Sequence, residues 1–315
     1  MTRLIYIIAL CLAGLTLSSQ QLPIFTQYAE YKGLIDPSFI PYEMYQEDFK
    51  VSTGAAYRDQ WTQLPDRPKT AAIRYEGITN KKKGVNLIYG GYFLHDDIGI
   101  FETNEIKGRI ASTITLRRGR YTKTLLTAGV NLGVGIYQVN LANSPFIEED
   151  PLLFRANSTQ IAPDAGLGIS LYNTFQNDDY LQIGFSIPQI INFNQVHSSK
   201  TKDFDIRRVP HYYLSTSYYK LLKESNHIEF SAWVRKLNNI PINYDVVIRY
   251  KFDSRMWVGA GLNSSGIIHT EIGLNFDVQD QNRVKIGYSF NPTFRAHGAV
   301  FGNIHELNFS YYLRQ

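Results

Sequence analysis

A strict two-residue alternation of side chains over residues 165–187 restricts the fold more than any other feature of the chain. Leu167, Ile169 and Leu171 alternate with glycine and serine, the turn-forming stretch NTFQNDD follows, and the alternation then resumes. A period of two places successive side chains on opposite faces of a β-strand, so the stretch is predicted to be an antiparallel hairpin with one apolar face. What the protein does depends on what each face contacts.

Strands with the same alternation continue to the end of the chain, separated by polar turns, and no segment of useful length has a helical period. We predict about fourteen strands, at residues 49–58, 68–78, 84–95, 104–117, 123–139, 163–173, 179–188, 210–221, 226–237, 241–252, 255–264, 267–277, 282–292 and 303–314. The chain is therefore expected to be all-β.

The distribution of charge and glycine distinguishes a membrane barrel from a soluble sandwich. Charges fall almost entirely on the non-apolar face of each strand, and an Arg or Lys that faced lipid would cost about 2–4 kcal/mol. Glycines such as Gly168 and Gly184 share that face, where they weaken a water-facing strand but leave room inside a closed barrel. These observations favour a transmembrane antiparallel β-barrel. Its inward-facing charges are predicted to include Lys107, Arg109, Arg249, Glu271 and Lys285.

The connections between the predicted strands differ in length at the two ends of the barrel. The long ones, at residues 59–67, 96–103, 140–162 and before Val209, all follow odd-numbered strands, whereas connections after even-numbered strands are short. Long loops at one rim and tight turns at the other are typical of outer-membrane barrels, with the turns in the periplasm. The expected fold is therefore an outer-membrane barrel with long extracellular loops and short periplasmic turns, in a Gram-negative bacterium.

The beginning of the chain is typical of an export signal. Residues 1–19 combine a basic start, an apolar stretch too short to cross a bilayer and a small-residue exit, with cleavage expected between about Ser18 and Gln20. Lipidation at Cys11 is disfavoured because Leu10 precedes it, where such sites carry a small residue. With the signal removed the chain has no cysteine, and its net charge of +4 does not indicate nucleic acid as a partner.

Residues 20–48 form an aromatic, proline-punctuated leader without a sustained period. Its three prolines each remove a backbone donor and discourage helix before them. The leader also carries too many apolar side chains to leave in water, so it is expected to pack on or in the barrel. The chain is thus predicted to consist of a signal peptide at residues 1–19, this leader at residues 20–48 and a barrel at residues 49–315.

Short motifs follow one another in a distinctive order along the mature chain. FTQY and LIDPSF stand in the leader, YRDQW and PKT come next, and GVNLIYGGYFLHDDIG, LTAGVNLGVGIYQVNL, PHYYLSTSY and HELNFSYYL complete the series. The series resembles the PorP/SprF family of type IX secretion system outer-membrane proteins over essentially the whole mature chain. Tyr31 and Lys32 stand where that family commonly has Asn-Pro, Asp36 stands for Asn, and Pro41 replaces a usual Gly.

The resemblance implies a non-enzymatic barrel that serves type IX secretion or gliding, in the cell-envelope machine or as partner of a secreted adhesin. It marks two groups of candidate site residues. The leader group, a partner-binding or structural motif, comprises Phe25, Gln27, Tyr28, Leu34, Asp36, Pro37 and Phe39. The group near the first loop comprises Tyr57, Arg58, Gln60 and Trp61.

No catalytic residue, metal site or cofactor is predicted. The seven histidines lie in separate strands and loops without metal-ligand spacing, and no nucleophile motif indicates a hydrolase. His95, Asp96 and Asp97 are interpreted as a rim turn. The glycine-rich stretch GVNLGVG lacks a following helix, which disfavours a phosphate site. The basic turns at residues 81–83 and 117–120 are interpreted as solvated surface, with an acidic periplasmic partner as the alternative.

Three functions are compatible with these features. The first is a secretion barrel that binds secreted cargo, or other secretion-system and gliding envelope proteins, through its long loops and leader, in contact with membrane lipid. The second is a passive porin-like channel for small solutes, although the inward charges could instead pair and fill the lumen. The third is a soluble secreted β-protein. The strand register itself is testable, because Ile183→Arg should impair membrane assembly and Ser186→Arg should be tolerated.

Overall fold

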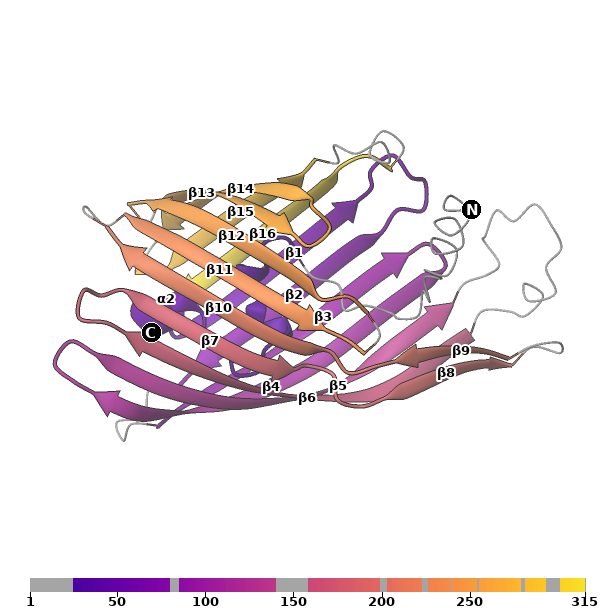
Figure 1. Cartoon of the computed structure of the whole chain (residues 1–315), viewed down its shortest axis with the longest axis horizontal. Coiled ribbons are helices and arrows are strands. Elements are labelled where there is room, and N and C mark those ends of the chain that lie inside the picture. The colour runs from indigo at the N-terminus through magenta and orange to yellow at the C-terminus, as the bar shows by residue number, and fades with distance from the viewer. Residues whose placement is uncertain are drawn as a thin grey trace, which may run out of the picture.

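A single closed antiparallel barrel of fourteen strands makes up most of the computed structural model (Figure 1). The structure describes residues 25–79, 85–139, 158–198, 203–222, 226–238, 240–253, 255–278, 281–292 and 301–314. The barrel strands are β1 Val51–Gln60, β2 Lys69–Ile78, β3 Val85–Ile98, β4 Phe101–Arg118, β5 Lys123–Val139, β6 Ser158–Thr174, β7 Tyr180–Ile187, β10 Tyr212–Leu221, β11 His227–Lys236, β12 Asn243–Phe252, β13 Met256–Asn263, β14 Ile268–Asp277, β15 Arg283–Asn291 and β16 Ile304–Leu313. The predicted fold class is confirmed.

Pairing of the first strand with the last closes the barrel. Val51 on β1 lies opposite Leu313 on β16, and Gln60 lies opposite Ile304 at the other end of the same ladder. The remaining strands pair with their neighbours along the chain, except that β7 pairs with β10. Because every barrel pair is antiparallel, all connections after β1, β3 and β5 share one rim. This rim, which carries the long connections, is here called the long-loop rim, and the opposite one the short-turn rim.

The predicted register holds in the hairpin of β6 and β7. Ile183 and Phe185 face outward and are exposed, whereas Gln182 and Ser186 face inward and are buried. A shift of one residue would exchange these two faces, so the outward apolar register supports a wall in contact with lipid.

One predicted long loop is wrong. Residues 96–103 are not a loop, because β3 and β4 continue to a tight turn in which Gly99 has a φ of +64°. The polar run that was interpreted as a rim turn is compatible with a strand, since Asp96 accepts a hydrogen bond from Thr70 on the inner side and His95 lies 2.8 Å from Asn104 across the ladder.

A second difference concerns the long connection between β7 and β10. Residues 192–208 were expected to wander without regular structure, but they contain β8 Phe193–Ser198 and β9 Asp203–Arg208, which form a separate two-stranded antiparallel sheet. The excursion before β6 is also shorter than expected, because β6 begins at Ser158. The predicted signal peptide lies outside the described residues.

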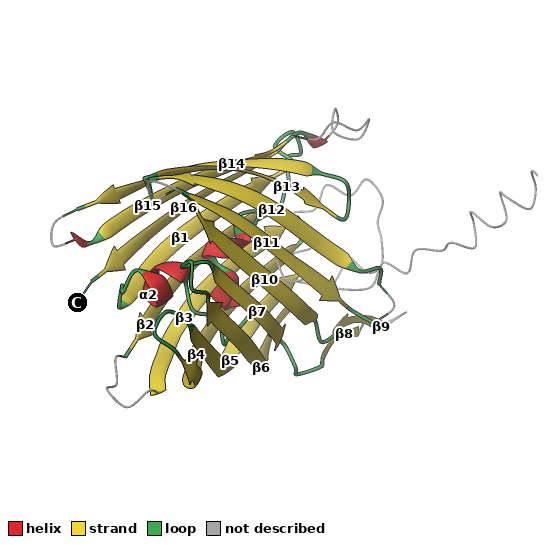
Figure 2. Ribbon diagram, turned by 60° about the vertical axis from the view of Figure 1, so that its left-hand side comes forward, coloured by secondary structure: helices red, strands yellow, loops and turns green. Residues whose placement is uncertain are grey.

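The leader lies inside the barrel. Figure 2 shows its short helices, in red, surrounded by the strands. They are the 3₁₀ turns η1 Tyr28–Glu30 and η2 Lys32–Leu34 and the five-residue helix α2 Tyr42–Gln46. Within the described part of the chain, no helix is long and apolar enough to cross a membrane.

Candidate functional site in the barrel lumen

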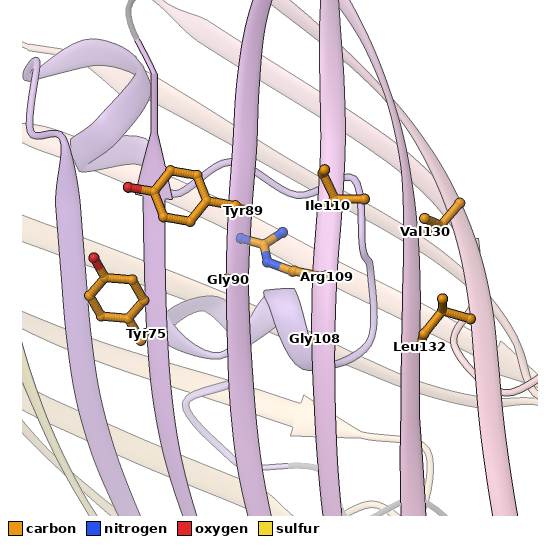
Figure 3. Close-up of a pocket in the computed structure, with 8 residues that line it drawn as sticks. All are labelled: Tyr75, Tyr89, Gly90, Gly108, Arg109, Ile110, Val130 and Leu132. Atoms are coloured by element: carbon orange, nitrogen blue, oxygen red, sulfur yellow. The ribbon is translucent and has the colours of Figure 1, made fainter.

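A hollow of about 450 Å³ lies on the outer wall rather than in the lumen (Figure 3). Gly108 faces outward there, opposite Gly91 on the neighbouring strand, so the wall lacks side chains at that point. Tyr75, Tyr89 and Leu132 border the hollow. Because these side chains belong to the outward apolar register, the hollow faces away from the lumen, and the candidate site must be sought inside.

The leader crosses the lumen from one rim to the other. Near the long-loop rim, the backbone N–H groups of Thr26 and Gln27 donate to the two carboxylate oxygens of Glu306 on β16, at 2.6 and 2.9 Å. Near the short-turn rim, Gln46 donates to Thr174 at the end of β6, and Glu47 pairs with Arg283 at the start of β15. The chain then enters β1 at that same rim.

Local chemistry explains why the leader stays irregular in the middle. The backbone N–H and the hydroxyl of Ser38 both donate to Oδ1 of Asp36, at 2.9 and 2.6 Å, which makes a tight turn around Pro37. On the wall, Ser170 donates to Oδ2 of the same carboxylate at 2.8 Å. A Cβ on Gly184 would lie only 2.5 Å from that oxygen, so the absent side chain on β7 is what lets the turn approach.

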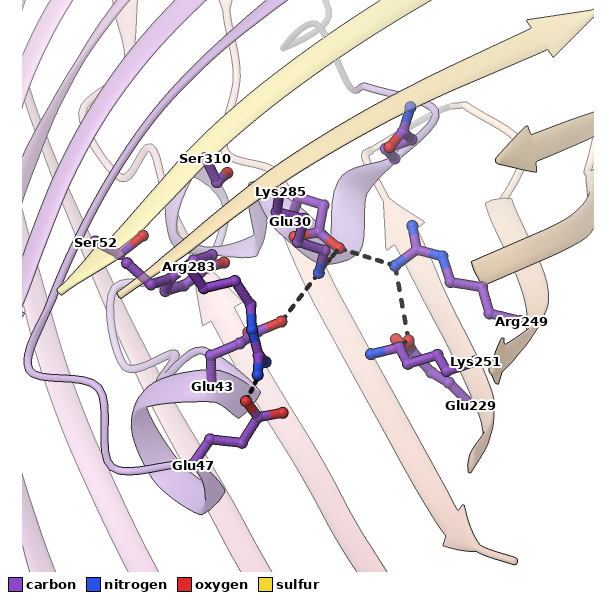
Figure 4. A network of polar contacts seen from close by, with 12 residues as sticks. Glu30, Glu43, Glu47, Ser52, Glu229, Arg249, Lys251, Arg283, Lys285 and Ser310 are labelled. Carbon is purple, nitrogen blue, oxygen red and sulfur yellow. Dashed lines mark hydrogen bonds and ion pairs between the residues drawn. The ribbon is translucent and has the colours of Figure 1, made fainter. Parts of the chain in front are cut away.

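Carboxylates of the leader are paired with cations of the wall (Figure 4). Glu30 lies 2.7 Å from Nζ of Lys285 and 3.2 Å from Arg249, and Glu43 lies 2.9 Å from the same Lys285. Arg249 also contacts Glu271 on β14 at 2.6 Å. Of the two alternatives for the inward charges, the structure therefore shows the one in which they pair and help to fill the lumen.

A second set of contacts holds the backbone of the leader. The guanidinium of Arg109 donates to the carbonyl oxygens of Pro37 and Phe39, at 3.1 and 2.7 Å, and to Glu76 at 2.6 Å. Arg74 contacts the same Glu76 at 2.8 Å. Both arginines and the glutamate are buried, and charge-assisted hydrogen bonds of this kind are stronger than neutral ones. Arg109 thus binds the leader by its main chain, whatever side chains the leader carries.

Burial shifts the titration of the leader's own charged groups. Burial lowers the pKa of Lys32 to about 8, although Asp36 and Glu229 attract its charge. Its ammonium donates to neutral partners, Gln182 at 2.7 Å and Ser217 at 2.9 Å. Burial alone would raise the pKa of Glu43, but the nearby lysines of the wall hold it well below its usual value.

The leader group of candidate residues is brought together inside the barrel. All of its members are buried, namely Phe25, Gln27, Tyr28, Leu34, Asp36, Pro37 and Phe39. Phe25 packs near Tyr31, and the hydroxyl of Tyr28 donates to Ser231 on β11. The first contact lies within the leader and the second joins it to the barrel, and the role of the group, partner-binding or structural, stays a prediction.

The first-loop group is divided between the two sides of β1. Tyr57 faces outward and is exposed, whereas Arg58 and Gln60 face inward. Trp61 follows the strand with a φ of +61° and packs against Phe301 at a ring distance of 5.7 Å. The inward members border a cavity of about 390 Å³ between the leader and the long-loop rim, here called the vestibule. It is lined by Phe25, Thr26, Arg58, Gln60, Trp61, Pro68, Thr70, Asp96, Ile98, Trp233, Arg235, Asn243, Tyr244, Asp245, Asn263, Ser264, Ser265, Ile267, Asn291 and Ile304.

Sequence reasoning missed the leader residues that make the charged contacts. Glu30, Lys32 and Glu43 are buried, and none of them is among the candidate site residues predicted from the sequence. A signal was present, since charged residues in an apolar leader need partners if the leader is buried. Among the described residues, no group of three or more His, Cys, Asp or Glu side chains could hold a metal ion.

Comparison with known families identifies the chain. The profile of the family described as type IX secretion system membrane protein PorP/SprF matches residues 17–311, nearly the whole sequence. The chain belongs to this family. The family assignment agrees with the motif series in the sequence and with a barrel whose wall is apolar outside. No curated protein matches the chain.

Solved outer-membrane barrels resemble this PorP/SprF protein in fold alone. The toluene transporter TbuX of Ralstonia pickettii matches with a TM-score of 0.50 at 6% identity, over 84% of this chain and 90% of the other. A FadL homologue of Pseudomonas aeruginosa matches with a TM-score of 0.48 at 10% identity, over 93% of this chain and 95% of the other. The translocator domain of the autotransporter NalP of Neisseria meningitidis matches with a TM-score of 0.44 at 5% identity, over 85% and 88%.

Proposed function

We propose that the protein serves type IX secretion as a closed outer-membrane barrel that binds secreted cargo or another envelope protein, and that it is not a passive pore. The observation that carries the proposal is the docked leader, whose residues 25–48 occupy the lumen between the rims. Its backbone and carboxylates are held by at least three wall cations, Arg109, Arg249 and Lys285. A solute path would require these buried pairs to separate.

Because the lumen is occupied, partner binding falls to the rims. The long-loop rim is the one predicted to face the cell exterior. It carries the longest connections and the vestibule, and surface loops on a rigid scaffold commonly carry binding residues. Residues 1–19 would direct export and be removed, which leaves the barrel in the outer membrane.

The test has two arms. Deletion of the gene should abolish surface display of a type IX cargo, and the intact chain should restore it. A pull-down from outer-membrane extracts, after cross-linking through a cysteine placed at Thr62 in the first loop, should recover that cargo or an envelope protein, while a cysteine at Asp253 on the short-turn rim serves as a matched control. Normal display after deletion, or steady ion conductance of the intact chain in planar bilayers, would contradict the proposal.

A further inference from the structure

The side chains that line the vestibule are those of a small-ligand site. Partner binding by the rims does not explain such a site. Phe25 and Thr26 of the leader form part of its lining, so the docked leader blocks it toward the short-turn rim. Its volume of about 390 Å³ lies in the usual range for small-ligand sites, about 300–1,000 Å³. A blind cavity of this size accepts a small molecule or a chain end.

The charges that line the vestibule balance one another. Arg58 and Arg235 contribute two positive charges, and Asp96 and Asp245 contribute two negative ones. The carboxylates already have partners, since Thr70 donates to Asp96 at 2.6 Å and His269 lies 3.2 Å from Asp245. A ligand with a net charge would leave one charge without a counterpart in a partly desolvated site, which is costly. The lining therefore favours a neutral ligand.

The polar groups of the lining indicate which class of neutral ligand fits the vestibule. The indole N–H of Trp233 has no hydrogen-bond partner among the described residues, although its side chain is more than nine-tenths buried. The amide groups of Gln60, Asn243 and Asn263 also line the cavity. The amide oxygens of Asn243 and Asn263 already accept hydrogen bonds from Ser264, Ser265 and Ile267. A hydrocarbon would leave the indole N–H of Trp233 unpaired, at about 1–3 kcal/mol, and would offer the amide N–H groups no acceptor. A ligand rich in hydroxyl groups would satisfy them.

The two indole rings lie on nearly opposite sides of the barrel mouth, Trp61 after β1 and Trp233 on β11. Trp61 is fixed by its neighbours, because the N–H groups of Thr62 and Gln63 donate to the backbone carbonyls of Asn303 and Phe301. Its left-handed backbone is uncommon for a tryptophan, and strained residues of this kind gather at functional sites. A sugar ring can stack its apolar C–H face on an aromatic ring that is held rigidly in this way.

We propose that the vestibule binds a neutral saccharide. The ring of Trp61 contacts a face of the sugar, and the indole N–H of Trp233 and the amides of Gln60 and Asn243 hydrogen-bond to its hydroxyls. The proposal stands apart from the proposed function, since it concerns a cavity whose occupation can be measured without secretion. A peptide end is the competing ligand, and a cavity without net charge disfavours either of its charged termini.

The test uses the purified full chain in a detergent without a sugar headgroup. Two of the three tryptophans line the vestibule, so intrinsic fluorescence reports its occupation. Cellobiose, N,N′-diacetylchitobiose and lactose are titrated as neutral probes, with trialanine as the peptide probe. At least one disaccharide should give a saturable change, and trialanine none.

Variants decide whether the change arises in the vestibule. Trp61→Ala and Gln60→Ala should each raise the dissociation constant of the disaccharide about tenfold or more. Tyr57→Ala, on the outer face of the same strand, should leave it unchanged. Heat-modifiable migration checks that each variant is folded. Failure of all three disaccharides to bind, stronger binding of trialanine, or equal affinity of the three variants would overturn the proposal.

Discussion

Lys32 shows how one residue of the leader depends on the barrel around it. Its ammonium is buried and donates to Gln182 and Ser217, while no described carboxylate lies within 4 Å of it. An ammonium in such surroundings is desolvated without a direct ion pair, which explains the lowered pKa of about 8. Docking of the leader is therefore linked to the protonation of Lys32.

The linkage predicts that the leader docks more firmly as the pH rises. Because the pKa of Lys32 is about 8 when docked and 10.5 otherwise, the docked state binds fewer protons between these values. Docking should strengthen from about pH 8 to about pH 9, approaching about tenfold per pH unit, and should be flat just below that window. Above it the leader tyrosines oppose the effect, because burial raises their pKa values from 10.0 and they ionise first in the undocked leader. Hydrogen exchange of the leader amides, corrected for intrinsic rates, measures this. Lys32→Met should abolish the dependence, and an unchanged slope in that variant would contradict the assignment.

Ile183 tests the outward register. It is 42% exposed on the outward side of β7, so Ile183→Arg should destabilise the barrel by about 2–4 kcal/mol and reduce the heat-modifiable fraction in the outer membrane if this side meets lipid. Ile183→Leu keeps the apolar character and should behave as the unchanged chain does. Equal assembly of the arginine and leucine variants would mean that this face does not meet lipid.

The structure changes the expectation for the neighbouring Ser186→Arg. Alternation alone assigns Ser186 to the lumen, where an arginine would be tolerated if the lumen held water. Its hydroxyl instead donates to the carbonyl oxygen of Ile35 at 2.7 Å, and its side chain is buried. The sequence determines which face a residue takes, because that depends on a local period. It does not determine what lies opposite, because that contact joins residues 151 positions apart.

At the scale of the elements, strands were predictable and irregular parts were not. All fourteen barrel strands have predicted counterparts, since alternation is a local property of each strand. The turn at Gly99 and the sheet of β8 and β9 were missed, because polar residues at the long-loop rim were interpreted as loop. The path of the leader across the lumen was likewise not predictable, since carbonyl contacts such as those of Arg109 leave no trace in the leader's own sequence.

The space left by the missing side chain of Gly184 on β7, which lets the leader approach the wall, can be tested by filling it. Gly184→Val on β7 should displace the turn at Asp36, because even a Cβ would meet its carboxylate at 2.5 Å. The barrel should still assemble, while exchange of the leader amides should rise about tenfold or more, as expected for a loss of about 1.4 kcal/mol. Gly108→Val is the matched control, since its Cβ would point outward with no atom nearer than 4.0 Å. Equal exchange rates of the leader amides in the two variants would show that the space at Gly184 does not hold the leader.

At the scale of the whole molecule, the leader links the two rims and acts as a core for the barrel. A barrel of fourteen strands encloses a lumen too wide for its wall side chains alone to fill, so another element or water must fill it. Here three buried clusters join leader and wall, around Ile40 and Tyr172, around Phe25 and Tyr92, and around Tyr28 and Trp233. Their spread along the leader explains why the lumen is filled from the vestibule to the short-turn rim and not at one constriction.

Removal of residues 25–47, with the signal and β1 retained, should therefore open the lumen. The wall cations Arg249, Lys285 and Arg109 would lose their leader partners and become hydrated, which favours an anion-selective pore. Single channels in planar bilayers should be frequent for the deleted chain and rare for the intact one, and adding back a synthetic peptide of residues 25–47 should lower the conductance. A deletion variant that migrates as a folded barrel yet shows no ion conductance would mean that something other than the leader closes the lumen.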